Sequence, residues 1–315
     1  MNEPWQAYMQ LGIVHFMAFG GIIKGEGPIV ETARRIAHDD FFEVLEVGLV
    51  NDPAVLAQLK ELARSSRLTL GVGGQPGLLT KKLNLADLNE AGRQAAVAQV
   101  KTSIDQAYFL GSKLMAFLDG PGSYPGESQA AQAKAQLTKS IKELCAYAKE
   151  KATDYTLFLS LETFDRTIEK KSLMGPNTEA AAFAAAIRKE YDNFGLTVDL
   201  SHLPLQGESA EHALMATKDC IVHAHVGNCA MRDPKHPAYG DYHPPFGVPG
   251  SENDVPELVE FLRVLFKIGY FNKTLPTGRP VVTFEVKPMP GDDSEGLLAA
   301  TKRVWRLAWA QLQLG

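Results

Sequence analysis

The feature that most constrains the fold is a regular alternation of short apolar segments with amphipathic segments along the whole chain of 315 residues. The apolar segments are rich in β-branched and aromatic residues, which is typical of buried strands. Eight of them are expected to be strands: LGIVHFMAF (11–19), FEVLEVGLV (42–50), LTLGVGG (68–74), KLMAFLDG (113–120), TLFLSLE (156–162), GLTVDLS (195–201), IVHAHVGN (221–228) and VVTFEVK (281–287). Each is followed by a segment with helical periodicity, at 28–37, 53–65, 87–111, 127–150, 178–190, 208–217, 254–268 and 294–312.

Strands that alternate with helices predict a parallel sheet covered by helices. Eight such units predict an α/β fold of the closed (β/α)8 type, the TIM barrel. Dividing 315 residues by eight gives about 39 residues per unit, which suits a strand, a helix and two loops. Because no shift of composition and no polar linker divides the chain, we expect a single domain over residues 1–315.

Two connections interrupt this rhythm. Residues 75–86 are expected to form a modest loop. The segment 226–253 is long and rich in Gly, Pro, His and aromatic residues, so we expect an ordered, functional loop after the seventh strand. Neither a dinucleotide-binding GxGxxG after a strand nor a Walker A motif occurs in the sequence.

Ionisable residues stand at the carboxyl ends of the last four predicted strands, namely Glu162, Asp199, His225 and Glu285. In a barrel, these strand ends and the loops after them build the active site. Side chains alternate along a strand, so the residues two positions earlier face the same way. Those residues are small or polar: Ser160, Thr197, His223 and Thr283. The intervening residues suit packing on helices: Leu161, Val198, Ala224 and Phe284. The alternation therefore predicts that the four strand-end side chains point together into the mouth of the barrel.

Three carboxylates that face one point need a positive counter-charge, and a divalent cation is the simplest one. Three carboxylates and one imidazole suit Mn²⁺, Mg²⁺, Co²⁺, Fe²⁺ or Zn²⁺. Because the set contains no cysteine, a structural zinc site is disfavoured. Any one of these residues, taken alone, is more often an ordinary strand-end polar group that is hydrogen-bonded or solvated. It is their succession on four strands that predicts one bound divalent metal ion.

The segments LSLETFD, VDLSH, HAHVGN and FEVKP, in this order, resemble the xylose isomerase-like TIM-barrel superfamily. This is the sugar phosphate isomerase/epimerase group, which includes ketose 3-epimerases and hydroxypyruvate isomerase. The resemblance extends from the first strand to the last helix. It implies the metal ligands Glu162, Asp199, His225 and Glu285. It also implies that His202 contacts the substrate. Arg232 resembles the arginine with which ketose 3-epimerases hold substrate oxygens, although its spacing is one residue longer.

Further polar residues of the last third of the chain have two open interpretations each. The stretch DYHPPFGVPG, which begins at Asp241, resembles the GDxHxPxG segment of the superfamily. Asp241 and His243 either brace the loop by hydrogen bonds or contact the substrate, and His243 is a candidate substrate-binding residue. Lys287 lies two positions after Glu285, so its side chain faces the same way. It is a second candidate substrate-binding residue, unless its side chain only reaches solvent. His15 either lines the pocket or fills the core, and His223 is expected to support the site rather than bind a ligand.

These residues predict a divalent-metal-dependent sugar isomerase or epimerase that works through an enediolate. Glu162 or Glu285 would remove a proton next to the substrate carbonyl, and the other glutamate would return one. Return to the opposite face of the same carbon gives epimerisation, and return to the neighbouring carbon gives isomerisation. Loss of a leaving group instead gives a lyase or dehydratase acting on a keto sugar or C-glycoside, where a partner subunit is typical. We rank this second, and a non-catalytic binding barrel third.

Composition disfavours several other classes. The net charge is −5 and no segment has a run of Lys and Arg, so nucleic acid is not an expected partner. The apolar runs are shorter than the about 18 residues that cross a membrane, and the start, MNEPWQAYMQ, does not look like a secretory signal. Cys145, Cys220 and Cys229 are too few and too scattered for a disulfide framework. We therefore expect a cytoplasmic enzyme with a small carbohydrate substrate, and a homo-oligomer is common in this group.

Overall fold

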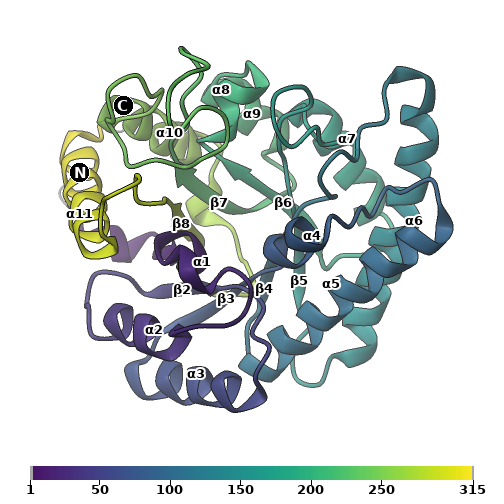
Figure 1. The fold of residues 1–315 in the computed structure, drawn as a ribbon, viewed down its shortest axis with the longest axis horizontal. Helices are drawn as coiled ribbons and strands as arrows, with labels where there is room; N and C mark the ends of the chain where they lie inside the picture. Colours follow the sequence, from purple (N-terminus) through teal and green to yellow (C-terminus); the bar gives the residue numbers. More distant parts are fainter. Residues whose placement is uncertain (1–2, 314–315) are drawn as a thin grey trace.

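Eight buried segments pair with their neighbours in chain order, and the last pairs with the first, so the sheet closes into a barrel (Figure 1). The computed structural model describes residues 3–313. All eight strand pairs are parallel. The strands are β1 (Gln10–Val14), β2 (Val44–Val47), β3 (Thr69–Gly73), β4 (Leu114–Phe117), β5 (Phe158–Glu162), β6 (Phe194–Asp199), β7 (Ile221–Gly227) and β8 (Val281–Glu285). The predicted (β/α)8 barrel is therefore confirmed.

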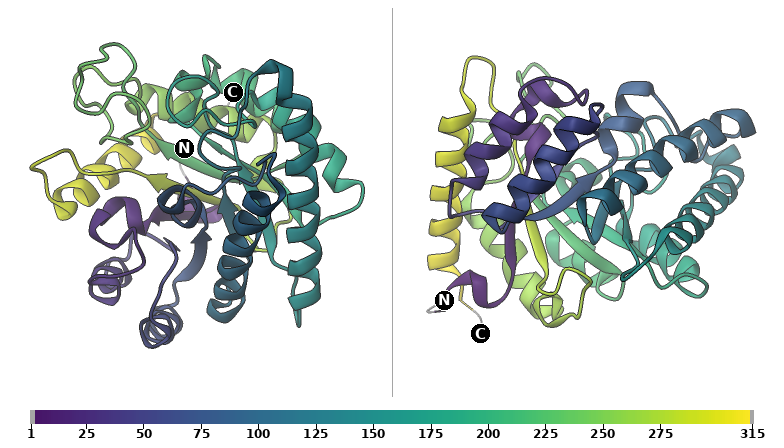
Figure 2. Two further views of the ribbon diagram at one scale, coloured as in Figure 1. Left: turned by 45° about the vertical axis from the view of Figure 1, so that its right-hand side comes forward. Right: turned by 90° about the horizontal axis from the view of Figure 1, so that it is seen from below.

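Helices surround the barrel on all sides in the further views (Figure 2). They are α1 (His15–Ala18), α2 (Ile29–Ala37), α3 (Pro53–Ser66), α4 (Gln75–Lys81), α5 (Glu90–Leu110), α6 (Glu127–Lys151), α7 (Asn177–Arg188), α8 (His202–Gln206), α9 (Ala210–Thr217), α10 (Val255–Lys267) and α11 (Ser294–Gln311). Three short 3-10 helices are η1 (Trp5–Ala7), η2 (Gly20–Ile22) and η3 (Tyr270–Asn272). Within residues 3–313, none of the helices combines the length and the apolar character that a bilayer crossing requires.

Local capping explains why several helices begin where the sequence predicts. The Asp52 carboxylate accepts a hydrogen bond from the Ala54 N–H at 2.8 Å, and Pro53 occupies the first turn of α3. At the start of α10, Asp254 and Glu257 form a capping box, in which the Asp254 N–H donates to Glu257 Oε2 at 2.9 Å. These contacts satisfy backbone donors that have no partner inside the helix.

The barrel wall separates an apolar outer layer from a polar inner layer. Phe284 points outward and lies with its ring centroid 5.7 Å from that of Trp305 on α11. Inside the barrel, Ser160 and Thr197 share a hydrogen bond of 2.6 Å between their hydroxyl oxygens. His223 Nε2 lies 3.0 Å from Thr283 Oγ1, also in the interior. The alternation predicted from the sequence therefore holds for these strands, because successive side chains of a strand point to opposite faces.

The structure corrects two expectations about local elements. The first strand was expected to continue to residue 19, but it ends at Val14, and His15 begins the short helix α1. The segment 75–86 was expected to be a loop, but its first half forms α4. Pro76 lies in the first turn of α4, where its missing N–H costs nothing, and the helix ends at Lys82, whose φ is +54°.

His15 packs in the core against Phe19, with ring centroids 5.7 Å apart, and its Nε2 lies 2.8 Å from Thr32 Oγ1. Of the two interpretations of His15, the core position is therefore the observed one. Burial lowers the pKa of His15 to about 3. Because the unfolded chain then binds a proton at pH 5 that the folded chain does not, stability should fall as the pH falls below about 6.5.

We expect the lowered pKa of His15 to reduce the free energy of unfolding by about 2 kcal/mol when the pH falls from 7 to 5. The variant His15→Gln should therefore show a flatter dependence of stability on pH over this range. Urea unfolding at several pH values measures it, with His212→Gln as the control, since His212 is exposed. An unchanged slope in His15→Gln would show that His15 does not contribute to acid destabilisation.

The connection from β7 to α10, residues 228–254, lies over the carboxyl ends of the strands at the upper left of Figure 1. Two buried asparagines hold it in place. Asn228 Nδ2 donates to the Pro245 carbonyl and to Ser251 Oγ, both at 2.8 Å. Asn253 Nδ2 donates to the Gly227 carbonyl at 3.0 Å. The loop is therefore ordered, as its composition predicts.

Candidate active site

The four strand-end residues meet at one point in the mouth of the barrel. Glu162, Asp199, His225 and Glu285 each offer a ligand atom, and these atoms lie within 4.8 Å of one another. His225 Nδ1 is 3.2 Å from Glu162 Oε1 and 2.8 Å from Glu285 Oε2. All four residues are buried. The closed barrel therefore brings together residues that are 123 positions apart at most (285 − 162).

The cluster carries more negative than positive charge in a buried setting. Burial alone would lower the pKa of His225, but the charges of Glu46 and Glu162, together with the hydrogen bonds that Glu162 and Glu285 accept from the imidazole, raise it well above its usual value. Asp199 Oδ1 accepts the Ser201 N–H at 2.8 Å, whereas Asp199 Oδ2 is buried without a hydrogen-bond partner, and its nearest cationic groups, His202 Nε2 and His243 Nδ1, are both 3.8 Å away. A buried anionic oxygen without a partner is costly unless a cation is near. The cluster therefore favours a positive charge at its centre.

A divalent cation fits this set of donors. Three carboxylates and one imidazole are ligands that borderline-hard ions accept, and the unpartnered Asp199 oxygen is an available ligand atom. A neutral imidazole binds a metal through a ring nitrogen, and His225 Nδ1 faces both glutamates of the cluster. The geometry thus agrees with the predicted ligand set, whose role as ligands stays a prediction.

Gln75, at the start of α4, belongs to the same site but was not singled out from the sequence. Its Nε2 donates to Glu162 Oε2 at 2.7 Å, and the side chain is buried. This contact fixes one oxygen of Glu162 and leaves the other near His225. The signal available in the sequence was a polar residue directly after the predicted third strand, where a barrel places site residues.

A second buried network, centred on Asp241, lies beside the four-residue cluster. Asp241 Oδ1 is 3.1 Å from His202 Nε2 and 2.9 Å from His243 Nε2, and Asp241 Oδ2 is 2.7 Å from Lys170 Nζ. Burial lowers the pKa of both histidines, but Asp241, together with the nearby carboxylates of the four-residue cluster, more than offsets this and raises the pKa to about 10 for His202 and about 9 for His243. Asp241 therefore braces the loop as a buried anion among three cationic groups.

The loop after β5 places Lys170 in this network. Its turn is organised by Asp165, whose carboxylate accepts the N–H groups of Ile168, Glu169 and Lys170 at 2.6, 2.8 and 2.9 Å. Glu169 Oε2 in turn accepts the Asp241 N–H at 2.6 Å. The sequence did not reveal this contact, because it joins two loops 72 residues apart.

The structure places His202 differently from the expectation that it contacts the substrate. His202 is fully buried, its Nδ1 donates to the Thr163 carbonyl at 2.8 Å, and its ring lies 4.2 Å from that of Phe164. It is not among the residues that line the pocket. His202 thus supports Asp241 from behind, whereas His243 reaches the pocket surface.

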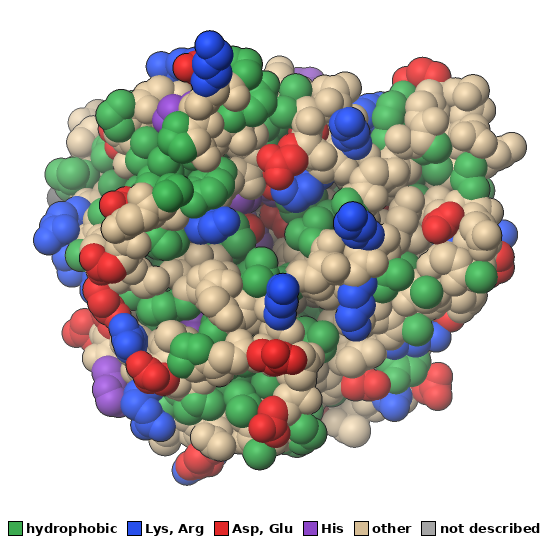
Figure 3. All heavy atoms as spheres, viewed as in Figure 1, with side chains coloured by type: hydrophobic (Ala, Val, Ile, Leu, Met, Phe, Trp, Pro, Cys, Tyr) green, Lys and Arg blue, Asp and Glu red, His purple; other side chains and the backbone are tan. Residues whose placement is uncertain are grey.

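A pocket of about 250 Å³ opens above the cluster. Its apolar lining residues include Phe16, Met17, Ile23, Leu79 and Phe164. Its polar lining residues include Glu169, Lys170, Asp241, His243, Glu285 and Lys287. The space-filling view shows a central hollow on this face, with acidic and histidine side chains in its depth and Lys or Arg side chains at its rim (Figure 3). A pocket of this size suits a small ligand that has both polar and apolar faces.

The two remaining candidate substrate residues differ in position. Lys287 lines the pocket, with its Nζ 4.3 Å from the centroid of the Tyr242 ring. Arg232 does not, since its side chain is 66% exposed and its Nε lies 3.3 Å from Glu252 Oε2. The expectation that Arg232 holds the substrate is therefore not supported by its position. The position of the Arg232 side chain depends on contacts within the long loop. These contacts cannot be deduced from the distance in sequence between Arg232 and β7.

Comparisons with known proteins match the barrel as a whole. The family model of the xylose isomerase-like TIM barrel matches residues 37–294. A D-tagatose 3-epimerase-like protein is 18% identical, with a TM-score of 0.70 over 97% of this chain and 100% of that one. The 3-keto-D-glucoside 4-epimerase of E. coli is 16% identical, with a TM-score of 0.63 over 95% and 99%.

An AP endonuclease, family 2, from Brucella melitensis is 14% identical, with a TM-score of 0.66 over 94% of this chain and 98% of that one. At these identities the structural matches establish the fold alone. A comparison with curated protein sequences gives no significant match.

Proposed function

Since the chain belongs to the xylose isomerase-like TIM-barrel family, we propose that it is a divalent-metal-dependent isomerase or epimerase of a small carbohydrate. The observation that carries the proposal is the convergence of Glu162, Asp199, His225 and Glu285 beside a pocket of about 250 Å³. The proposed cofactor is one ion of Mn²⁺, Mg²⁺, Co²⁺ or Zn²⁺. A bound divalent cation would attract the substrate oxygens, make the neighbouring carbon-bound proton more acidic and stabilise the negative charge of the enediolate.

The two glutamates are the proposed proton carriers. Glu285 lines the pocket, so its carboxylate is the one with direct access to a bound substrate. Glu162 lies deeper, where Gln75 and His225 fix its two oxygens. Glu285 would remove one proton from carbon and Glu162 would give a different proton from another direction, which is what epimerisation requires; exchange with solvent would then restore both carboxyl groups.

The other polar residues of the pocket wall would orient the substrate. His243 and Lys287 line the pocket and are the proposed contacts for substrate oxygens. The apolar lining residues Phe16, Met17 and Leu79 would pack on the carbon skeleton. Phosphodiester hydrolysis is less well supported, because the chain is acidic and nucleic-acid recognition depends on basic surfaces.

Solvent exchange tests this function directly. The metal-loaded protein is incubated in D₂O with a panel of keto and aldo sugars, and the products are read by NMR and mass spectrometry. We expect deuterium at the carbon next to the carbonyl, together with an epimer or an aldose–ketose isomer. Loss of a leaving group would identify the lyase or dehydratase instead. No exchange with any sugar of the panel, in protein with a full complement of metal, would favour a non-catalytic barrel.

The pocket geometry also predicts which of two basic side chains, Lys287 or Arg232, contributes to substrate binding. Lys287→Met should raise KM by about tenfold or more, because one hydrogen bond from a charged group contributes about 1.5–3 kcal/mol and each 1.4 kcal/mol is tenfold. Arg232→Met, at the exposed position, should change KM by less than twofold. Steady-state kinetics on the substrate found in the exchange panel measures both. A larger effect in Arg232→Met than in Lys287→Met would contradict the proposed edge of the pocket.

A further inference from the structure

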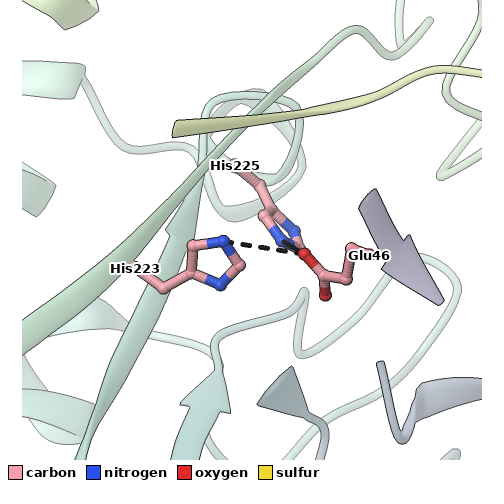
Figure 4. A group of neighbouring side chains, drawn as sticks. All are labelled: Glu46, His223 and His225. Carbon is pink, nitrogen blue, oxygen red and sulfur yellow. Dashed lines mark hydrogen bonds and ion pairs between the residues drawn. The ribbon is translucent and has the colours of Figure 1, made fainter. Parts of the chain in front are cut away.

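Glu46 reaches across the interior of the barrel to the candidate metal ligand on β7. It stands on β2, which is separated from β7 by β1 and β8 in the closed sheet. Its Oε2 lies 3.1 Å from His225 Nε2, and both side chains are buried (Figure 4). No spacing in the sequence predicts this contact, because it joins residues 179 positions apart.

The two ring nitrogens of His225 face different partners. Nε2 faces Glu46, whereas Nδ1 faces Glu162 and Glu285, at 3.2 and 2.8 Å. A carboxylate only accepts hydrogen bonds, so Nε2 must carry the proton in this contact. Nδ1 faces carboxylates as well, so it gives up its proton only when a cation takes that place; the neutral imidazole then directs the Nδ1 lone pair at the centre of the four-residue cluster.

We propose that Glu46 is a positioning residue, which holds His225 in the Nε2–H tautomer and directs its Nδ1 toward the bound cation. This inference rests on the proposed function, since it assigns a role at the same metal centre. A carboxylate that accepts the second N–H of a metal-binding histidine fixes both the ring orientation and the tautomer, and its loss weakens metal binding by about 10–100-fold.

His223, two positions before His225 on β7, does not form the equivalent hydrogen bond with Glu46. His223 Nε2 is 3.6 Å from Glu46 Oε2 and has a closer partner in Thr283 Oγ1, at 3.0 Å. The rings of His223 and His225 are nearly perpendicular, with an angle of 80° between them, so they do not stack. In Figure 4 both imidazoles approach the same oxygen of Glu46, and His225 is the nearer one.

The competing assignment is that Glu46 itself binds a cation. Ligand atoms of Glu46, His223 and His225 lie within 4.8 Å of one another, so a second ion is a geometric alternative. It would require His225 to bind metal through Nε2 and would remove the proton from that nitrogen. The two assignments therefore differ in the number of ions per chain and in the tautomer of His225.

Metal titration of chelator-treated protein tests the role of Glu46. With Mn²⁺ in isothermal titration calorimetry, we expect one ion per chain in the unmodified protein and a Kd about 10–100-fold higher in Glu46→Ala. Glu46→Gln should recover most of the affinity, because its amide oxygen can still accept the Nε2–H. The matched control is Thr197→Val, which removes the buried hydroxyl contact with Ser160 in the same layer. It should bind Mn²⁺ with unchanged affinity.

A second readout does not depend on any variant. In Zn²⁺-loaded protein with ¹⁵N-labelled histidine, long-range ¹H–¹⁵N correlation spectra should show His225 protonated at Nε2 and not at Nδ1. Unchanged Mn²⁺ affinity in Glu46→Ala would overturn the inference but leave the proposed function intact. So would a proton on Nδ1, or two ions per chain of which Glu46→Ala loses one. If the unmodified protein binds no divalent ion, the inference and the proposed function both fail.

Discussion

Glu285→Gln and Glu162→Gln should each reduce deuterium exchange into the substrate by about 10²–10⁴-fold, the usual contribution of a positioned acid or base. The amide keeps the size of the carboxylate and one acceptor oxygen, but it cannot accept the substrate proton. Glu285 lines the pocket and Glu162 is fixed by Gln75, so each substitution removes one of the two proposed proton carriers. Exchange is followed by NMR in D₂O at saturating metal.

Both glutamates are also proposed metal ligands, so metal content has to be measured in each variant by elemental analysis. Glu260→Gln is the matched control, because it makes the same chemical change at a half-exposed position on α10, where the side chain pairs with Arg263 outside the barrel. It should keep the full exchange rate. Persistent exchange in both site variants, with metal bound, would show that the two-glutamate mechanism is wrong. Loss in Glu285→Gln alone would reduce the mechanism to a single base.

Removal of the divalent ion should abolish turnover and lower the thermal stability of the protein. A ligand that binds only the folded state at 100 times its Kd stabilises it by about 2.7 kcal/mol. For a chain of this length that corresponds to a rise in Tm of about 5 °C. Differential scanning fluorimetry of chelated protein, with and without added Mn²⁺ or Co²⁺, measures this shift. We expect it because a cation relieves the mutual repulsion of Glu162, Asp199 and Glu285.

The variants separate this effect from non-specific binding of metal. Asp199→Asn and His225→Ala should lose most of the shift, because each removes a ligand of the cluster. Thr197→Val should retain the shift, although its Tm without metal is expected to be lower, since it loses a buried hydrogen bond. No shift in the unmodified protein, together with no bound ion at saturation, would refute a metal-dependent enzyme.

The barrel could be predicted from the sequence because its signals are local. Alternation marks β5 to β8, and caps such as Asp52 and Asp254 mark the helix starts. The errors also have local causes. The apolar run 11–19 does not show where a strand gives way to a helix, and His15 turned out to begin α1. A proline in a first turn, at Pro76, is compatible with a loop as well as with a helix.

The candidate site was predictable only in part. The alternation of side chains states which face of a strand a residue lies on, and in a barrel the inner faces all converge. That argument was sufficient for Glu162, Asp199, His225 and Glu285. It could not show that His202 is covered by Phe164, nor that Arg232 points to Glu252, because both depend on how the loops fold over the barrel.

The sequence by itself determined the eight βα units and the four residues at their strand ends, since period and parity are properties of neighbouring residues. Only the tertiary structure decided the partners of those residues: Gln75 on Glu162, Glu46 on His225, and Lys170 on Asp241. Each of these contacts crosses the barrel or joins two loops. Such contacts form when the sheet closes and buried charges pair. Neither process produces a regular spacing of residues along the sequence.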